Sequence, residues 1–199
     1  MKHLNLLRGY TQAGIIQFGR FVREDGRVDP LDLNFLLLPS YPALLRETAT
    51  ALAPHLQQAV HKYGIDRLLS TRATTALGGV LAVQSNIPLT YPYGEAREAT
   101  NAYLIEGAYD IAHPTALLAY ILDADTGAAL HPAQTVGLPV RVVLSLFELG
   151  TAPRAALIED GLEVITLFDL RAALDAMAAE SIFPPGLRAH LDEWLAGFA

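Results

Sequence analysis

Residues 116–129, ALLAYILDADTGAA, decide the fold. The first seven, 116–122, form an unbroken apolar run of strand length, and an acidic turn that contains a glycine follows. Strands that are buried on both faces of a parallel sheet have continuous apolar runs of this kind. The stretch therefore predicts a central strand that ends in a turn at the edge of the sheet.

Similar strand-length segments recur along the chain, at residues 65–70, 89–93, 140–147 and 163–167.

Helical spacing of apolar residues predicts a helix that Ser40 caps and Gly64 ends, and Pro54 inside this helix should kink or split it. Further helices are predicted at 74–84, at 170–179 and around Trp194. Alternating strands and helices favour an α/β fold with a doubly wound, mostly parallel sheet flanked by helices, which binds ligands at the carboxyl ends of its strands.

Composition narrows the class of protein. The chain has 199 residues, of which 52% are hydrophobic, and we expect one domain over 1–199. The 14 Lys and Arg do not cluster, and the formal net charge is -7, so nucleic acid is not expected as a partner. No apolar run is long enough to span a membrane and the first residues do not resemble a signal peptide, so we expect a cytoplasmic protein.

Chemistry that uses cysteine is excluded, because the chain contains no cysteine. The six histidines are too scattered to give a recognisable zinc spacing, so no metal site made of protein side chains is expected.

The turn after residues 116–122 offers two carboxylates, Asp123 and Asp125, with the hydroxyl of Thr126 and the flexible Gly127. Carboxylates can bind ribose hydroxyls, and backbone N–H groups at the start of a helix can bind a phosphate. Taken by itself, the stretch is better explained as an acidic turn in which Asp and Thr cap the next helix and Gly relieves backbone strain.

A second candidate lies after residues 65–70, where Thr71 and Arg72 precede two more threonines. Arginine and hydroxyl groups can hold an anion there. The equally weighted alternative is a plain turn from strand to helix, capped by Thr.

The order of these motifs resembles the type I phosphoribosyltransferases, the orotate enzymes in particular. Residues 18–30, FGRFVREDGRVDP, are similar to the family's opening segment. Residues 91–107 resemble its catalytic loop and end on LIEG at 104–107, and 116–129 fall at its phosphoribosyl-pyrophosphate signature. The resemblance implies a small N-terminal hood at 1–39, an α/β core at 40–179, a helical tail at 180–199, and a homodimer.

Several functional positions depart from the family pattern. Leu122 stands in place of the first acid of the signature, so Asp123 matches the second and Asp125 is a possible substitute. Ala128 and Ala129 stand where hydroxyl or glycine residues would contact phosphate. Arg97 matches the catalytic-loop lysine. The other losses are of basic or imidazole groups, at Glu24, Tyr93, Gly94, Ala99 and 147–150.

These losses remove positive charge from a site that must neutralise a pyrophosphate leaving group, and each missing donor typically costs about 10²- to 10³-fold in rate. The sequence favours a catalytically degenerate relative that binds a phosphorylated ribose or nucleotide. One alternative is a working enzyme that makes orotidine monophosphate with Mg²⁺, held mainly by ligand phosphates. In that case Asp123, Asp125, Thr126 and Arg97 would act. The other alternative is a non-enzymatic dimeric interaction module.

Overall fold

The computed structural model describes residues 3–93, 104–108 and 112–197. A six-stranded sheet lies at its centre, with the strand order β5-β4-β3-β6-β7-β8. Five strands are parallel, and β5 runs antiparallel to β4. The strands are β3 (Arg67–Ser70), β4 (Leu89–Tyr93), β5 (Leu104–Gly107), β6 (Thr115–Ile121), β7 (Val140–Glu148) and β8 (Glu163–Asp169). The predicted α/β fold with a mostly parallel sheet is confirmed.

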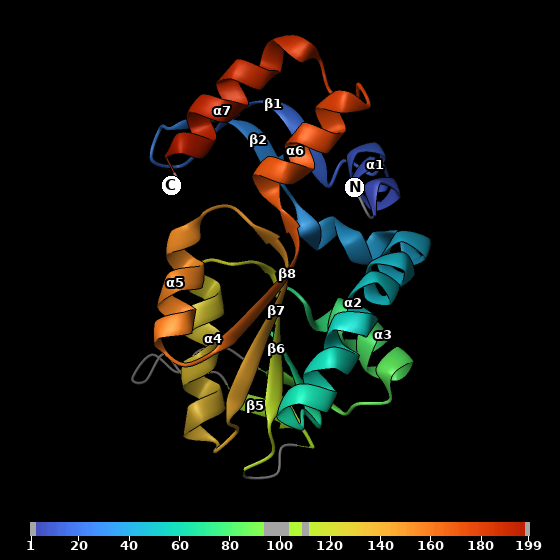
Figure 1. The fold of residues 1–199 in the computed structure, drawn as a ribbon, viewed down its shortest axis with the longest axis vertical. Helices are drawn as coiled ribbons and strands as arrows, with labels where there is room; N and C mark the ends of the chain where they lie inside the picture. Colours follow the sequence, from blue (N-terminus) through green and yellow to red (C-terminus); the bar gives the residue numbers. More distant parts are fainter. Residues whose placement is uncertain (1–2, 94–103, 109–111, 198–199) are drawn as a thin grey trace.

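Helices cover both faces of this sheet (Figure 1). The two on one face are α2 (Pro42–Tyr63) and α3 (Thr75–Ser85), and the two on the other are α4 (Ala124–Thr135) and α5 (Thr151–Glu159). Residues of β6 alternate between two apolar clusters, so that Ala116 and Leu118 join one and Leu117 joins the other. A strand buried on both sides needs this continuous apolar sequence.

The strand order reverses direction between β3 and β6. From β3 the chain passes to β4 on one side, whereas β6, β7 and β8 follow one another on the other side. The two strands are in parallel register, with Ser70 opposite Leu118. Their carboxyl ends therefore meet at a topological switch point, where a crevice for ligands forms in open α/β sheets.

The start of α2 differs from the prediction. Tyr41 is the N-cap residue and Pro42 occupies the first turn, while Ser40 ends a short 3-10 helix, η1 (Phe35–Ser40). Proline suits this position because its fixed φ matches the helix and its missing N–H would have no helical partner there. Pro54 does not split the helix, which continues to Gly64 in the left-handed conformation.

The N-terminal and C-terminal elements lie together beyond one end of the sheet (Figure 1). The N-terminal ones are α1 (Leu4–Gln12) and an antiparallel hairpin of β1 (Ile16–Val22) and β2 (Val28–Leu33). The C-terminal ones are α6 (Leu170–Ala179), η2 (Pro185–Leu187) and α7 (Arg188–Ala196). The Trp194 indole on α7 donates a hydrogen bond to Asp29 on β2, 2.8 Å away. We call this assembly the hood; it includes the C-terminal elements α6, η2 and α7 as well as the N-terminal segment for which the sequence predicted a hood.

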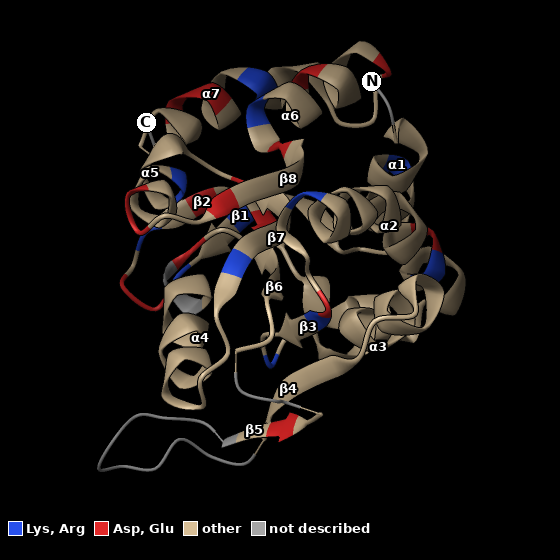
Figure 2. Ribbon diagram, turned by 60° about the horizontal axis from the view of Figure 1, so that its bottom comes forward, with Lys and Arg blue, Asp and Glu red and all other residues tan. Residues whose placement is uncertain are grey.

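No described helix combines the length and the hydrophobicity that crossing a lipid bilayer would require. Lys and Arg residues are spread over separate elements rather than gathered on one face in the view of Figure 2.

Candidate functional site

Two adjoining cavities open at the carboxyl ends of β3 and β6. The first has a volume of about 380 Å³ and lies between the turn after β3 and helix α4. The second has a volume of about 440 Å³ and lies between the end of β6 and the segment from β2 to η1. We call them the Arg72 cavity and the hood-side cavity. Leu36, Thr71 and Ala73 line both, so the two cavities are neighbours.

The turn after β3 is held by hydrogen bonds among its own threonines. The backbone N–H of Thr71 donates to Thr74 Oγ1 (2.9 Å), and the Thr74 hydroxyl donates to the carbonyl oxygen of Leu118 on β6 (2.8 Å). Thr71 Oγ1 in turn accepts from the backbone N–H of Thr74. These bonds fix the turn against β6 and place Thr71 and Arg72 on the wall of the Arg72 cavity.

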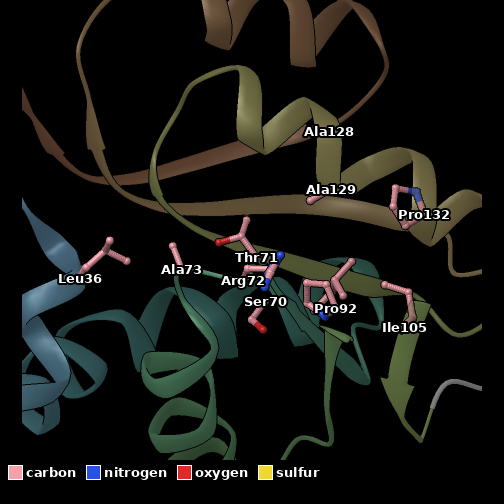
Figure 3. A pocket seen from close by; sticks show the side chains of 11 residues that line it. Leu36, Ser70, Thr71, Arg72, Ala73, Pro92, Ile105, Ala128, Ala129 and Pro132 are labelled. Atoms are coloured by element: carbon pink, nitrogen blue, oxygen red, sulfur yellow. The ribbon is translucent and has the colours of Figure 1, made fainter. Parts of the chain in front are cut away.

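Figure 3 shows the Arg72 cavity, with Thr71 and Arg72 on one side and Ala128, Ala129 and Pro132 of α4 on the other. Pro92 of β4 and Ile105 of β5 complete the wall. Ala128 and Ala129 line the cavity with methyl groups, where hydroxyl groups could have bound an anion. The predicted residues Thr71, Arg72, Ala128 and Ala129 are thus brought together.

Asp123 begins α4 as its N-cap. Its Oδ1 accepts a hydrogen bond from the backbone N–H of Thr126 (3.1 Å), and Thr126 Oγ1 accepts one from the backbone N–H of Asp123 (3.3 Å). This is a capping box, as the structural interpretation of the turn predicted. The protein's own carboxylate therefore already occupies the start of α4, where positive partial charge from the helix favours an anion.

Gly127 plays no part in relieving strain at this turn. It lies within α4, its φ is not in the left-handed region, and a Cβ added there would meet no atom within 4 Å. The expectation that this glycine relieves backbone strain is therefore wrong. Asp125 is also part of α4, but its side chain lies outside the described structure, as does the whole of Arg97.

The hood-side cavity carries residues that the sequence did not single out. Asp32 comes from β2, Asn34 from the link between β2 and η1, Phe35 from η1 and Tyr120 from β6. Asp123 and Thr126 line the same cavity. Asp32 Oδ1 lies 3.0 Å from Arg23 Nη1, and Arg23 also forms an ion pair with Asp29. Hydrogen bonds to these two carboxylates raise the pKa of Arg23. Arg23 therefore forms ion pairs with two acids beside this cavity.

Tyr120 and Phe35 form an aromatic floor, with ring centroids 5.1 Å apart and nearly parallel planes. The Tyr120 hydroxyl is buried and has no hydrogen-bond partner among the described residues. Burial raises the pKa of Tyr120 to about 12. A tyrosine inside an otherwise aliphatic strand was the one signal in the sequence that could have identified this position.

The end of β7 provides no cation to either cavity. The buried Glu148 accepts two hydrogen bonds from the Arg154 guanidinium of α5, both at 2.7 Å. Arg154 also donates to the Val164 carbonyl oxygen, and the bonds to Glu148 raise its pKa. Among the described residues that line the two cavities, Arg72 is the only Lys or Arg.

Within the described part of the chain, no three His, Asp or Glu side chains gather closely enough to hold a metal ion. A divalent cation at this site would depend mainly on oxygen atoms from a ligand, as Mg²⁺ commonly does in sites that bind phosphates.

Comparison with solved structures identifies the fold. UMP synthase from Leishmania donovani superposes with a TM-score of 0.84 over 99% of this chain, at 21% identity, and the match spans 43% of that longer chain. Orotate phosphoribosyltransferase from Aeropyrum pernix gives 0.75 over 87% of this chain and 98% of its own, at 15% identity. Adenine phosphoribosyltransferase from Saccharomyces cerevisiae gives 0.60 over 82% and 99%, at 14% identity.

No protein-family model matches the sequence, and no curated protein matches it. The likeness is therefore one of fold, the type I phosphoribosyltransferase fold that the order of motifs predicted. Function has to be argued from the site, because one fold hosts many functions.

Proposed function

We propose that this chain, which has the type I phosphoribosyltransferase fold, is a catalytically degenerate relative of orotate phosphoribosyltransferase that binds a phosphorylated ribose or nucleotide. The observation that carries the proposal is the placement of Arg72 on a cavity of about 380 Å³ at the switch point of the sheet. Small ligands bind at such points in doubly wound folds.

Arg72 supports binding of a phosphate in particular. A guanidinium presents several N–H donors in a planar fork that matches two oxygens of a phosphate group. Thr71 lies beside it on the same wall and adds a hydroxyl. The hydrogen bonds from Thr71 to Thr74 hold the backbone of the turn in place, so little has to be ordered when the ligand binds.

Degeneracy is supported by the charge of the site. Transfer of a phosphoribosyl group releases pyrophosphate, whose developing charge needs several cationic donors. Arg72 is the only Lys or Arg among the described lining residues, and Asp32 and Asp123 bring negative charge nearby. The capping carboxylate of Asp123 further disfavours a second phosphate at the start of α4.

Isothermal titration calorimetry with ribose 5-phosphate tests the binding. We expect micromolar affinity, and loss of at least about tenfold in Arg72→Ala, since a hydrogen bond to a charged group contributes about 1.5–3 kcal/mol. Arg141→Ala removes an exposed arginine of β7, which does not line either cavity, and is the matched control. Equal affinities in wild type and Arg72→Ala would refute the assignment of the phosphate to Arg72.

Turnover of orotate and phosphoribosyl pyrophosphate with Mg²⁺ tests the degeneracy. We expect no turnover above background. In a working enzyme, Mg²⁺ would be held mainly by the ligand phosphates and by few protein carboxylates, and Asp123 is the candidate that the sequence offered. Turnover that disappears in Asp123→Asn would show a functional catalytic site and overturn the degenerate assignment.

A further inference from the structure

The hood-side cavity differs from the Arg72 cavity in the charged residues that line it. Asp32 and Asp123 both line it, and its described lining includes no Lys, Arg or His. Arg23 contacts Asp32 from outside the lining, but it also pairs with Asp29. Three acids, Asp29, Asp32 and Asp123, against the single arginine Arg23 give these four residues at the cavity a net negative charge.

Its other lining groups suit a flat, hydrogen-bonding ligand. Asn34 supplies a side-chain amide, and the stacked rings of Phe35 and Tyr120 form an apolar floor. Carboxylate oxygens only accept hydrogen bonds, so Asp32 and Asp123 select for N–H donors on the ligand. A carboxylate on the ligand would face both acids in a partly enclosed space, where like charges are strongly disfavoured.

The geometry points to a ligand with two unlike ends, a phosphate at Arg72 and an amino-bearing base in the hood-side cavity. This inference rests on the proposed binding of a phosphorylated ribose and names the class of base. The two cavities are neighbours that share Leu36, Thr71 and Ala73, and the inference places one nucleoside monophosphate across both. The site selects an aminated base such as cytosine and rejects a carboxylated one such as orotate, with Asp32 and Asp123 as the specificity-determining residues.

Calorimetric titrations with three pyrimidine nucleotides test which class of base the hood-side cavity prefers. Cytidine 5′-monophosphate carries an exocyclic amino group, uridine 5′-monophosphate lacks it, and orotidine 5′-monophosphate carries a carboxylate. We expect the cytidine nucleotide to bind more tightly than the uridine nucleotide and at least about tenfold more tightly than the orotidine nucleotide. Ribose 5-phosphate is titrated in parallel, because it reports the phosphate site alone.

Variants assign the selectivity to the two acids. Asp32→Asn and Asp123→Asn each remove one negative charge, and each should narrow the preference for the cytidine over the orotidine nucleotide. If Asp32→Asn fails to fold because Arg23 loses one of its two acidic partners, Asp123→Asn still tests the inference, since Asn also caps helices well. Asp25→Asn, an exposed acid paired with Arg27 and outside both cavities, changes the total charge equally and should leave the preference unaltered.

The outcomes distinguish this inference from the proposed function. Binding of ribose 5-phosphate without a preference for the cytidine nucleotide overturns the inference and leaves the phosphate site standing. A preference that both cavity variants leave unchanged also overturns it. If neither ribose 5-phosphate nor any nucleotide binds, the proposed function and the inference both fail.

Discussion

Asp123 and Thr126 hold each other across the first turn of α4: the Asp123 carboxylate accepts from the Thr126 backbone N–H at 3.1 Å, and the Thr126 hydroxyl accepts from the Asp123 backbone N–H at 3.3 Å. The Thr126 hydroxyl also donates to the carbonyl oxygen of Ile121, 3.0 Å away. The residues that the sequence presented as candidates for binding ribose are thus engaged in joining β6 to its helix.

The cap at Asp123 predicts a contrast between two substitutions. Asp123→Ala should lower the free energy of unfolding by about 1 kcal/mol, because it leaves the first turn of α4 without its acceptor. Asp123→Asn should stay close to wild type. Urea denaturation measures both, and Asp169→Ala, which removes the corresponding cap of α6, should resemble Asp123→Ala. Equal stability of Asp123→Ala and wild type would show that the capping bond is not formed in solution.

Gly127 should behave as an ordinary helix residue. Gly127→Ala should raise the free energy of unfolding by about 0.5–1 kcal/mol, since alanine favours the helix and its Cβ meets open space. Gly107→Ala is the contrasting control: Gly107 has a φ of 101°, and a Cβ there would lie 2.5 Å from the Leu89 carbonyl oxygen. That substitution should destabilise the protein by more than about 1 kcal/mol. Thermal and urea unfolding of both variants would reveal any reversal of this order.

Removing the hydroxyl group from each of two buried tyrosines should change the stability of the protein in opposite directions. Tyr120→Phe should stabilise the protein by about 1 kcal/mol, because its buried hydroxyl has no hydrogen-bond partner among the described residues. Tyr10→Phe should destabilise it by a similar amount, because the Tyr10 hydroxyl is 2.7 Å from Thr48 Oγ1. Chemical denaturation at pH 7 compares them, and a destabilised Tyr120→Phe would indicate a partner for that hydroxyl.

Alkaline pH gives an independent check on Tyr120. Because burial raises its pKa from 10.0 to about 12, titration of Tyr120 leaves the stability of the wild type unchanged below pH 10 and lowers it as the pH rises toward 12 and beyond. Tyr120→Phe should therefore lose less stability than wild type between pH 9 and pH 11, as measured by denaturation at a series of pH values. Parallel curves for the two proteins would contradict the burial of this hydroxyl.

The lowered pKa of Glu163 predicts that the stability of the protein also depends on pH in acid, although more weakly. The Tyr63 hydroxyl donates to Glu163 at 2.7 Å, and this bond, followed by Lys62, lowers the pKa of the carboxyl from its ordinary value of 4.5. The resulting stability is present above pH 4.5 and is lost as the pH falls through the lowered pKa. Tyr63→Phe should cost less than about 1 kcal/mol at pH 7, because the pair is partly exposed, and it should cost less still once Glu163 is protonated.

The measurement for Glu163 is the urea midpoint of wild type and Tyr63→Phe at pH 7 and near pH 3. Tyr93→Phe, on an exposed tyrosine of β4, controls for the loss of a hydroxyl group. A difference between wild type and Tyr63→Phe that persists undiminished in acid would exclude the bond to the Glu163 carboxylate as its source.

The strands of the sheet were predictable because their signal is local. The predicted segment at residues 116–122 corresponds to β6, and 140–147 to β7, with limits shifted by one residue. The start of α2 was predicted wrongly, although Pro42 carried the correct signal: proline in the first turn outweighed the capping preference of Ser40.

The Arg72 cavity was only partly predictable. Thr71 and Arg72 follow β3, and Ala128 and Ala129 lie on the helix after β6, so parallel pairing of the two strands brings them together. The proximity of these residues follows from the strand order alone. Asp32, Asn34 and Phe35 carry no comparable motif, and their role depends on where the hood settles against the sheet.

The sequence by itself determined a parallel α/β sheet, its switch point and a turn that begins with Asp123, because apolar runs and capping residues act over a few neighbouring positions. Only the tertiary structure decided that Asp32 and Asp123 line the same cavity and that Arg72 is the only Lys or Arg among the described lining residues. These relationships join segments some ninety residues apart in the chain, and their electrostatic effect depends on distance and burial in space, which no local pattern encodes.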